Sequence, residues 1–184
     1  MPLDYYAEPQ GEPSELAIAL LKVPANMSTS DPAYRGSILI NPGGPGGSGV
    51  DAALAYGLAV QSIIGDDFDI IGFDPRGKYS IVVHHTGQLL MAHAGVSRTT
   101  PGIDAFRGAN LQRQVWGIRD LGAPTLNDSA EALPWTIATQ RLYNTLLADK
   151  AADVAPYVGT AATARDMLSI IDALGQGSLL EVVG

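Results

Sequence analysis

The sequence contains no cysteine and unusually few charged residues, and both shortages limit what the chain can be. Without cysteine there is no disulfide scaffold, no thiolate metal site and no cysteine nucleophile. Charged residues make up 16% of the chain, against about 25% in an ordinary soluble domain. Because 46% of the residues are hydrophobic, we expect a folded chain with buried strands, or a surface that another segment covers.

The charges that are present are mostly acidic, with 19 Asp and Glu residues against 11 Lys and Arg residues and a net charge of −8. Such a chain repels phosphate backbones, so we expect no nucleic-acid partner. The apolar stretches 16–23 and 52–64 are too short to span a bilayer, so no membrane partner is expected either. The N-terminus shows no signal-peptide pattern, which leaves the localisation unknown and makes the cytoplasm the default expectation.

A strand, a glycine-rich loop, a helix and a second strand are predicted in succession in the first half of the chain. Residues 36–41 and 68–74 are short apolar runs typical of buried strands, and residues 50–64 are typical of a helix packed on a sheet. Such a βαβ unit implies a parallel sheet. The other predicted elements are a strand at 16–23, helices at 109–120, 129–147 and 160–174 (with Thr160 as N-cap), and a strand at 178–183.

The loop after the first strand of this unit is the most informative feature. It reads Pro42-Gly43-Gly44-Pro45-Gly46-Gly47-Ser48-Gly49 and contains G-x-G-x-x-G at 44–49. With Asp74 at the end of the next strand, this pattern is typical of a dinucleotide-binding βαβ module. Glycine amides can equally form an oxyanion hole, and the two prolines remove N–H groups that a pyrophosphate would use. A glycine-rich turn without any ligand is the third interpretation.

Several segments together resemble one branch of a known family. They are Pro2-Leu3-Asp4-Tyr5, residues 38–49, residues 68–77 with Asp74-Pro75-Arg76-Gly77, and residues 157–167. These segments look like the tripeptidyl aminopeptidase-like, prolyl iminopeptidase-related serine peptidases of the α/β-hydrolase family. The resemblance implies an α/β fold class, namely an incomplete α/β-hydrolase fold with a mostly parallel sheet flanked by helices.

The same resemblance implies roles for individual residues and a reaction. The expected oxyanion-hole loop comprises Gly43, Gly44, Pro45, Gly46 and Gly47, and the expected structural turn comprises Asp74, Arg76 and Gly77. From the residues alone, Arg76 is expected to pair with Asp74 or with a backbone carbonyl. The implied reaction is hydrolysis of a peptide-like substrate through an acyl-enzyme, without a cofactor or metal.

The nucleophile elbow of that family, Gly-x-Ser-x-Gly, does not occur in the sequence. The nearest match, residues 46–50, fails at its last position and lies in the wrong loop. In the family the elbow would follow the strand predicted at 178–183, and the acid and the histidine would come later still. We therefore expect 1–184 to be the N-terminal part of one α/β-hydrolase domain, truncated before the nucleophile, with no catalytic residues and no activity of its own.

The remaining polar features suggest structural roles. Residues 78–108 are atypical of the family, and the histidines within them (His84, His85 and His93) lack a carboxylate cluster, so no metal site is expected. Arg165 and Asp166 are interpreted as solvated residues on a helix face. A sheet that ends early exposes an edge strand, so we expect self-association through that edge.

Overall fold

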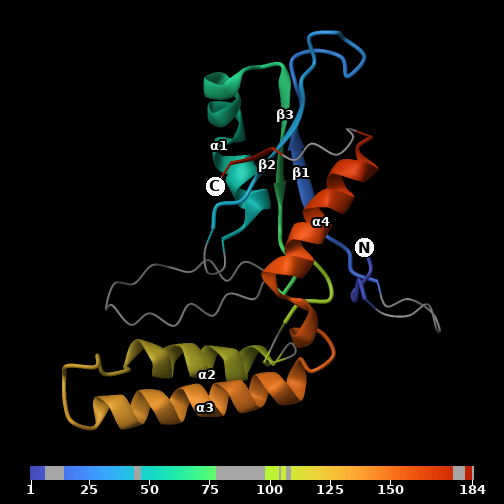
Figure 1. Cartoon of the computed structure of the whole chain (residues 1–184). Coiled ribbons are helices and arrows are strands. Elements are labelled where there is room, and N and C mark those ends of the chain that lie inside the picture. The colour runs from blue at the N-terminus through green and yellow to red at the C-terminus, as the bar shows by residue number, and fades with distance from the viewer. Residues whose placement is uncertain are drawn as a thin grey trace.

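A small mixed sheet of four strands forms the centre of the chain (Figure 1). The computed structural model describes residues 1–6, 15–43, 47–77, 98–103, 105–106, 109–175 and 181–183. The strands are β1 (Leu20–Val23), β2 (Gly36–Ile40), β3 (Phe68–Phe73) and β4 (Glu181–Val183), in the order β1-β3-β2-β4. β2 pairs in parallel with β3 and with β4, while β1 runs antiparallel to β3. The carboxyl ends of β2, β3 and β4 therefore lie at the same edge of the sheet.

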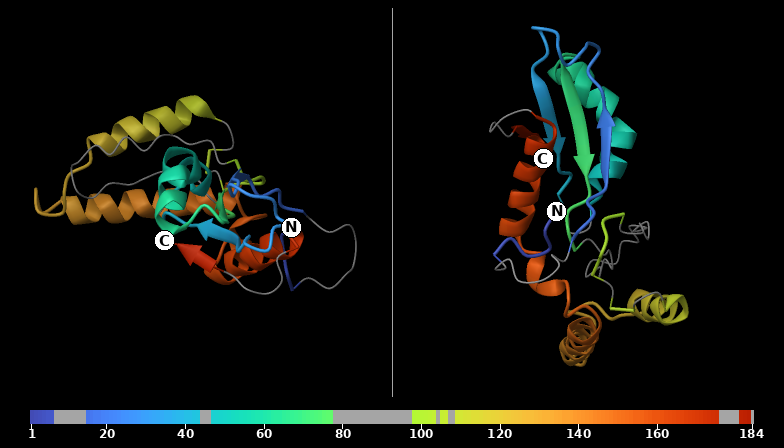
Figure 2. Two further views of the ribbon diagram at one scale, coloured as in Figure 1. Left: turned by 90° about the horizontal axis from the view of Figure 1, so that it is seen from above. Right: turned by 90° about the vertical axis from the view of Figure 1, so that its right-hand side faces the viewer.

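Two helices, α1 (Gly49–Ile64) and α4 (Thr160–Ala173), cover opposite faces of this sheet (Figure 2). Alternate residues of a strand point to opposite faces, and here both faces are apolar. The α1 side is formed by Ile38, Ile40, Ala52, Phe68 and Ile70. The α4 side is formed by Leu39, Ile71, Phe73, Ile170 and Ile171. This two-sided burial explains why the two central strands read as continuous apolar runs.

A helical hairpin of α2 (Asn110–Leu121) and α3 (Ala132–Lys150) lies beyond the carboxyl end of β3 (Figure 1). The short 3-10 helix η1 (Ala155–Tyr157) then leads to α4. The hairpin has its own core around Trp116. The centroid of the Trp116 ring lies 5.9 Å from that of Phe106 and 5.8 Å from that of Tyr143. This small cluster is separate from the two that flank the sheet, and other apolar residues of the hairpin, such as Val115 and Ile118, are exposed.

The structure corrects some of the predicted boundaries. β1 begins at Leu20 because Ala17 forms an isolated antiparallel bridge with Thr100 instead of continuing along β3. Thr160 is not the N-cap of α4, since the preceding Gly159 takes the extended conformation of that position and no side chain caps the helix. The histidines at 84, 85 and 93 lie outside the described residues.

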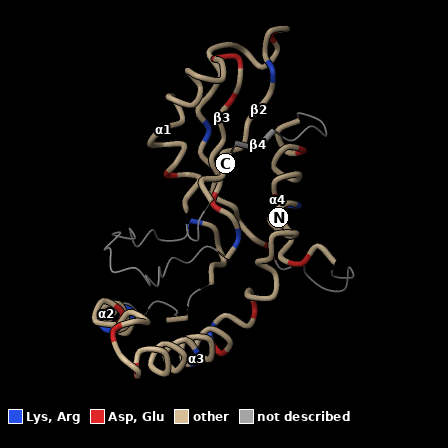
Figure 3. Tube along the Cα trace, turned by 60° about the vertical axis from the view of Figure 1, so that its left-hand side comes forward, with Lys and Arg blue, Asp and Glu red and all other residues tan. Residues whose placement is uncertain are grey.

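Acidic and basic residues are interspersed along the described trace (Figure 3). Within the described ranges, no three His, Asp or Glu side chains are grouped so that they could hold a metal ion. None of the helices described is long and apolar enough to cross a membrane.

Candidate functional site

The candidate site lies at the carboxyl edge of the parallel strands, where the loop after β2 and the turn after β3 are neighbours. Ile40 pairs with Gly72, so the loop that starts at Asn41 and the turn that starts at Asp74 leave the sheet side by side. In open α/β sheets, ligands bind outside the carboxyl ends of the strands. The two motifs singled out in the sequence therefore meet where a ligand is expected.

The two described ends of the glycine loop are packed against each other. Gly43 has a φ of +72°, and its N–H donates a hydrogen bond of 3.1 Å to Asn41 Oδ1. A Cβ on Gly47 would lie 2.3 Å from the Gly43 carbonyl oxygen, so no larger residue fits at position 47 without a shift of the backbone. Both positions favour glycine, the first for its conformation and the second for lack of space.

The assignment of oxyanion donors within this loop stays a prediction. The Gly43 amide is engaged by the Asn41 side chain, which suits Gly43 as a residue that forms the turn. The other members of the expected loop, Gly44, Pro45 and Gly46, lie outside the described residues.

Beyond the loop, the first turn of α1 lies directly on the backbone of β3. A Cβ on Gly49 would lie 2.1 Å from the carbonyl oxygen of Phe73, and a Cβ on Gly72 would lie 1.9 Å from the carbonyl oxygen of Gly49. Glycine at both positions allows this close approach of helix and strand. Packing alone therefore accounts for the last glycine of the G-x-G-x-x-G pattern, whichever ligand the loop serves.

Asp74 is fully buried, and its carboxylate points toward the start of α1. Its Oδ1 accepts a hydrogen bond of 2.6 Å from Ser48 Oγ, and the Val50 amide lies 3.4 Å from the same oxygen. Ser48 in turn is the N-cap of α1 and accepts from the Asp51 amide at 3.0 Å. A carboxylate held in this way does not face outward, where a ribose hydroxyl would bind. The geometry therefore counts against the dinucleotide interpretation.

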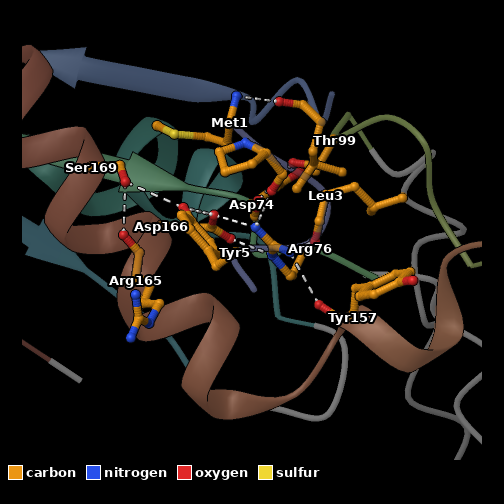
Figure 4. A network of polar contacts seen from close by, with 12 residues as sticks. Met1, Leu3, Tyr5, Asp74, Arg76, Thr99, Tyr157, Arg165, Asp166 and Ser169 are labelled. Atoms are coloured by element: carbon orange, nitrogen blue, oxygen red, sulfur yellow. Dashed lines mark hydrogen bonds and ion pairs between the residues drawn. The ribbon is translucent and has the colours of Figure 1, made fainter. Parts of the chain in front are cut away.

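Arg76, two residues further on, points to the opposite side of the sheet and joins separate segments of the chain (Figure 4). Its Nε and Nη2 donate to the two carboxylate oxygens of Asp166, at 2.6 and 2.5 Å. Nη1 donates to the carbonyls of Leu3 and Tyr157, and Nη2 donates to that of Pro2. Five N–H donors are all that a guanidinium has, so every one of them is used. The carboxylate partner of Arg76 is thus Asp166 on α4, and backbone carbonyls supply the remaining acceptors.

The interpretation of Asp166 as a solvated residue is wrong, because its side chain is completely buried beside Arg76. Tyr5 also donates to it, with 2.6 Å between the Tyr5 hydroxyl and Asp166 Oδ1. Burial, followed by this hydrogen bond, raises the pKa of Tyr5, and the hydrogen bonds to Asp166 raise the pKa of Arg76. One signal in the sequence could have identified Asp166. It lies four residues before Ile170 and therefore on the buried face of α4.

The turn itself is closed by Gly77, the third member of the expected structural turn. Gly77 has a φ of +69°, and a Cβ there would lie 2.3 Å from Val158 Cγ1. In this turn, Asp74 contacts the start of α1 and Arg76 contacts α4. Gly77 lies against the segment before α4. The turn links the glycine loop to the rest of the molecule, and its two charged side chains are inside the protein rather than available to a ligand.

Comparison with known proteins yields relatives named as hydrolases, although no family model matches the chain. It is 28% identical to a tripeptidyl aminopeptidase of Streptomyces lividans over 181 residues, which is 97% of the chain and 28% of that protein. It is 44% identical to the serine protease Hip1 of Mycobacterium tuberculosis over 80 residues, 44% of the chain and 14% of Hip1. Carboxylesterase B of the same organism is 39% identical over 109 residues, 58% of the chain and 17% of the esterase. The chain therefore spans under a third of the length of each of these relatives.

Proposed function

Because its relatives place the chain in an α/β-hydrolase, serine peptidase-like family, we propose that it is the part of a serine hydrolase that carries the oxyanion-hole loop. The observation that carries the proposal is the similarity to a tripeptidyl aminopeptidase, which is 28% identical and extends over 97% of the chain. A glycine loop at the carboxyl edge of the sheet supports it. The proposed substrate is peptide-like, since that relative is named as a peptidase of this type.

The proposed role of the loop follows from the chemistry of acyl transfer. Attack on a carbonyl places negative charge on its oxygen, and backbone N–H groups aimed at that oxygen lower the barrier. In α/β-hydrolases one such donor comes from a glycine-rich loop that follows a strand. In our proposal Gly43 shapes the turn and Gly44 supplies the donor. The reaction passes through an acyl-enzyme and uses no metal or cofactor.

We further propose that the 184-residue chain does not hydrolyse peptides by itself. It contains no Gly-x-Ser-x-Gly motif, and Ser48, the serine of the glycine loop, already takes part in other hydrogen bonds. Ser48 donates to the buried carboxylate of Asp74 and caps α1, so its hydroxyl is already engaged at both its proton and its oxygen. The nucleophile, the acid and the histidine of the reaction would have to come from polypeptide outside these residues.

The first test is made on the purified chain with tripeptidyl and aminoacyl chromogenic reporters and a fluorophosphonate probe for activated serines. The expected result is no turnover and no labelling. Turnover or labelling that persists in the Ser48→Ala variant would contradict the proposed inactivity. Turnover that disappears in that variant would identify Ser48 as a nucleophile and contradict its structural assignment.

The second test asks whether the chain can serve as part of a hydrolase. The segment of the Streptomyces lividans tripeptidyl aminopeptidase that aligns with the chain is replaced by residues 1–184, and the folded chimera is assayed with a tripeptidyl reporter. The proposal expects turnover by the chimera, and a folded chimera without turnover counts against it. Expressing the two parts as separate polypeptides provides a second arm that does not depend on the junctions.

A further inference from the structure

We propose that Asp74 is a positioning residue for the glycine loop and that it acts through Ser48. The inference rests on the proposed function in one respect, because the loop binds an oxyanion only if the chain is part of a hydrolase. The mechanical link itself is a property of the described residues and can be measured in the chain alone. Asp74 is not assigned contact with a substrate.

A short series of hydrogen bonds joins Asp74 to the end of the loop. The Asp51 amide donates to Ser48 Oγ at 3.0 Å, and Ser48 Oγ donates to Asp74 Oδ1 at 2.6 Å. The serine hydroxyl can do both only if its proton points at the carboxylate, so its side chain has one orientation. The hydrogen bond to an ionised acceptor is of the stronger, charge-assisted kind. Ser48 is thereby held to one position at the point where the loop enters α1.

The other end of this series is fixed by the sheet. The Asp74 amide donates to the carbonyl of Ala19 at 3.0 Å, and the Asp74 carbonyl accepts from Thr99 Oγ1 at 2.6 Å. Thr99 also accepts from the amide of Ala19 at 3.2 Å. The backbone of Asp74 is therefore bonded to two neighbouring segments, and its buried side chain has a rigid base.

The described residues beside Ser48 leave little room for a movement of its backbone. Gly47, the residue before it, lies so close to the Gly43 carbonyl that a methyl group would not fit between them. Gly49, the residue after it, lies against the backbone of Phe73 in the same way. Ser48 is thus enclosed between two close backbone contacts. If it moves, Gly47 and Gly43 must move with it.

One further contact reaches Ser48, and it is weaker. Arg98 Nη1 lies 3.4 Å from Ser48 Oγ and 2.8 Å from Asp51 Oδ1, at the exposed end of α1. An exposed pair of this kind contributes little, so the buried carboxylate is the dominant restraint on Ser48.

The experiment uses amide NMR spectra and hydrogen exchange of the 184-residue chain. Ser48→Ala removes the link, Ser48→Thr keeps a hydroxyl at the cap, and Asp74→Asn removes the charge from the acceptor. Ser62→Ala is the matched control, because it removes a serine hydroxyl from the exposed face of the same helix. We expect Ser48→Ala and Asp74→Asn to shift the amide signals of Gly43 and Gly47 in the same direction. In Ser48→Thr these signals should stay close to their positions in the unchanged chain. Loss of a cap costs about 1 kcal/mol, or about a fivefold faster exchange of the Asp51 amide.

The proposal is overturned if Ser48→Ala changes only the amides of α1 and leaves Gly43 and Gly47 where they were. It is also overturned if Ser62→Ala moves the loop signals as much as Ser48→Ala does. If Asp74→Asn does not fold, the comparison of the alanine and threonine variants at position 48 decides. A loop that responds as expected in a chain whose chimera lacks activity would support the positioning role and contradict the proposed function, so the two failures are distinguishable.

Discussion

Replacing Asp166 by alanine removes the only carboxylate that faces the buried guanidinium of Arg76 among the described residues. Both side chains of the pair are completely buried in the native protein. After the change, Arg76 keeps its hydrogen bonds to three backbone carbonyls but has no negative partner. Tyr5 loses its short hydrogen bond to Asp166 at the same time and keeps the contact of 3.2 Å with Ser169 Oγ. The perturbation therefore leaves an uncompensated charge in the interior instead of merely deleting a contact.

The expected loss in the free energy of unfolding is about 3–5 kcal/mol, the usual cost of breaking a buried ion pair by removing one partner. This is a large share of the roughly 5–15 kcal/mol that stabilises an ordinary folded domain. Tyr5→Phe should cost only about 1–2 kcal/mol, because it removes the hydroxyl's hydrogen bonds to Asp166 and Ser169 and leaves the ion pair intact. Asp149→Ala is the matched surface control. Asp149 and Lys150 form an exposed pair, and its loss should change stability by less than about 1 kcal/mol.

The assay is urea unfolding followed by far-ultraviolet circular dichroism, with linear extrapolation to water. The predicted order of destabilisation is Asp166→Ala, then Tyr5→Phe, then Asp149→Ala. If Asp166→Ala is no more destabilising than Asp149→Ala, then the Arg76 network does not hold the segments together as described. The reasoning about the turn after β3 would then fail.

Three further predictions concern other parts of the molecule. Burial would raise the pKa of Asp69, but hydrogen bonds from a lysine, a backbone amide and a tyrosine hydroxyl outweigh it and lower that pKa. Ionised Asp69 therefore contributes its full stabilisation above the pKa of the unfolded state, and this contribution is lost as the pH falls below about 4. In the Asp69→Asn variant, the free energy of unfolding should fall less steeply as the pH is lowered through this range. Gly72→Ala places a Cβ against a backbone oxygen and should lower the melting temperature. Gly117→Ala places a Cβ into open space on a helix and should raise the free energy of unfolding by about 0.5–1 kcal/mol, with a higher melting temperature. Val115 and Ile118 are 58% and 69% exposed on α2. Changing both to Gln should therefore reduce the binding of an apolar dye and the self-association measured by light scattering. Unchanged dye binding would show that these two side chains do not form an apolar binding surface.

The central part of the fold could be predicted from the sequence because its signals are local. Residues 36–40 and 68–73 are buried on both faces, so their apolar runs mark the strands directly. The helix between them begins within one residue of its predicted start. The close packing of Gly49 also agrees with the motif, since a helix that leaves a strand through a tight turn must approach the backbone closely.

The Arg76 network could not be predicted in the same way, because it joins residues that are far apart in the chain. Arg76 and Asp166 are 90 residues apart. The spacing of Asp166 to Ile170 indicates the buried face of α4, but it does not identify Arg76 as the partner. The start of β1 shows the same limit. Residues just before Leu20 were apolar enough for a strand, but a pairing with Thr100 takes Ala17 away from β3. In both cases the deciding contact comes from a distant segment.

We propose above that this chain supplies the oxyanion-hole loop of a serine hydrolase, and kcat of the chimera with the Streptomyces lividans enzyme tests this most directly. Gly47→Ala introduces a Cβ 2.3 Å from the Gly43 carbonyl, while Gly117→Ala introduces one into open space. We expect an active chimera. In it, Gly47→Ala lowers kcat by about 10²-fold or more, which is the scale of losing one oxyanion donor, and Gly117→Ala leaves kcat unchanged. A folded chimera that is inactive, or one in which the two variants have the same kcat, would contradict the claim.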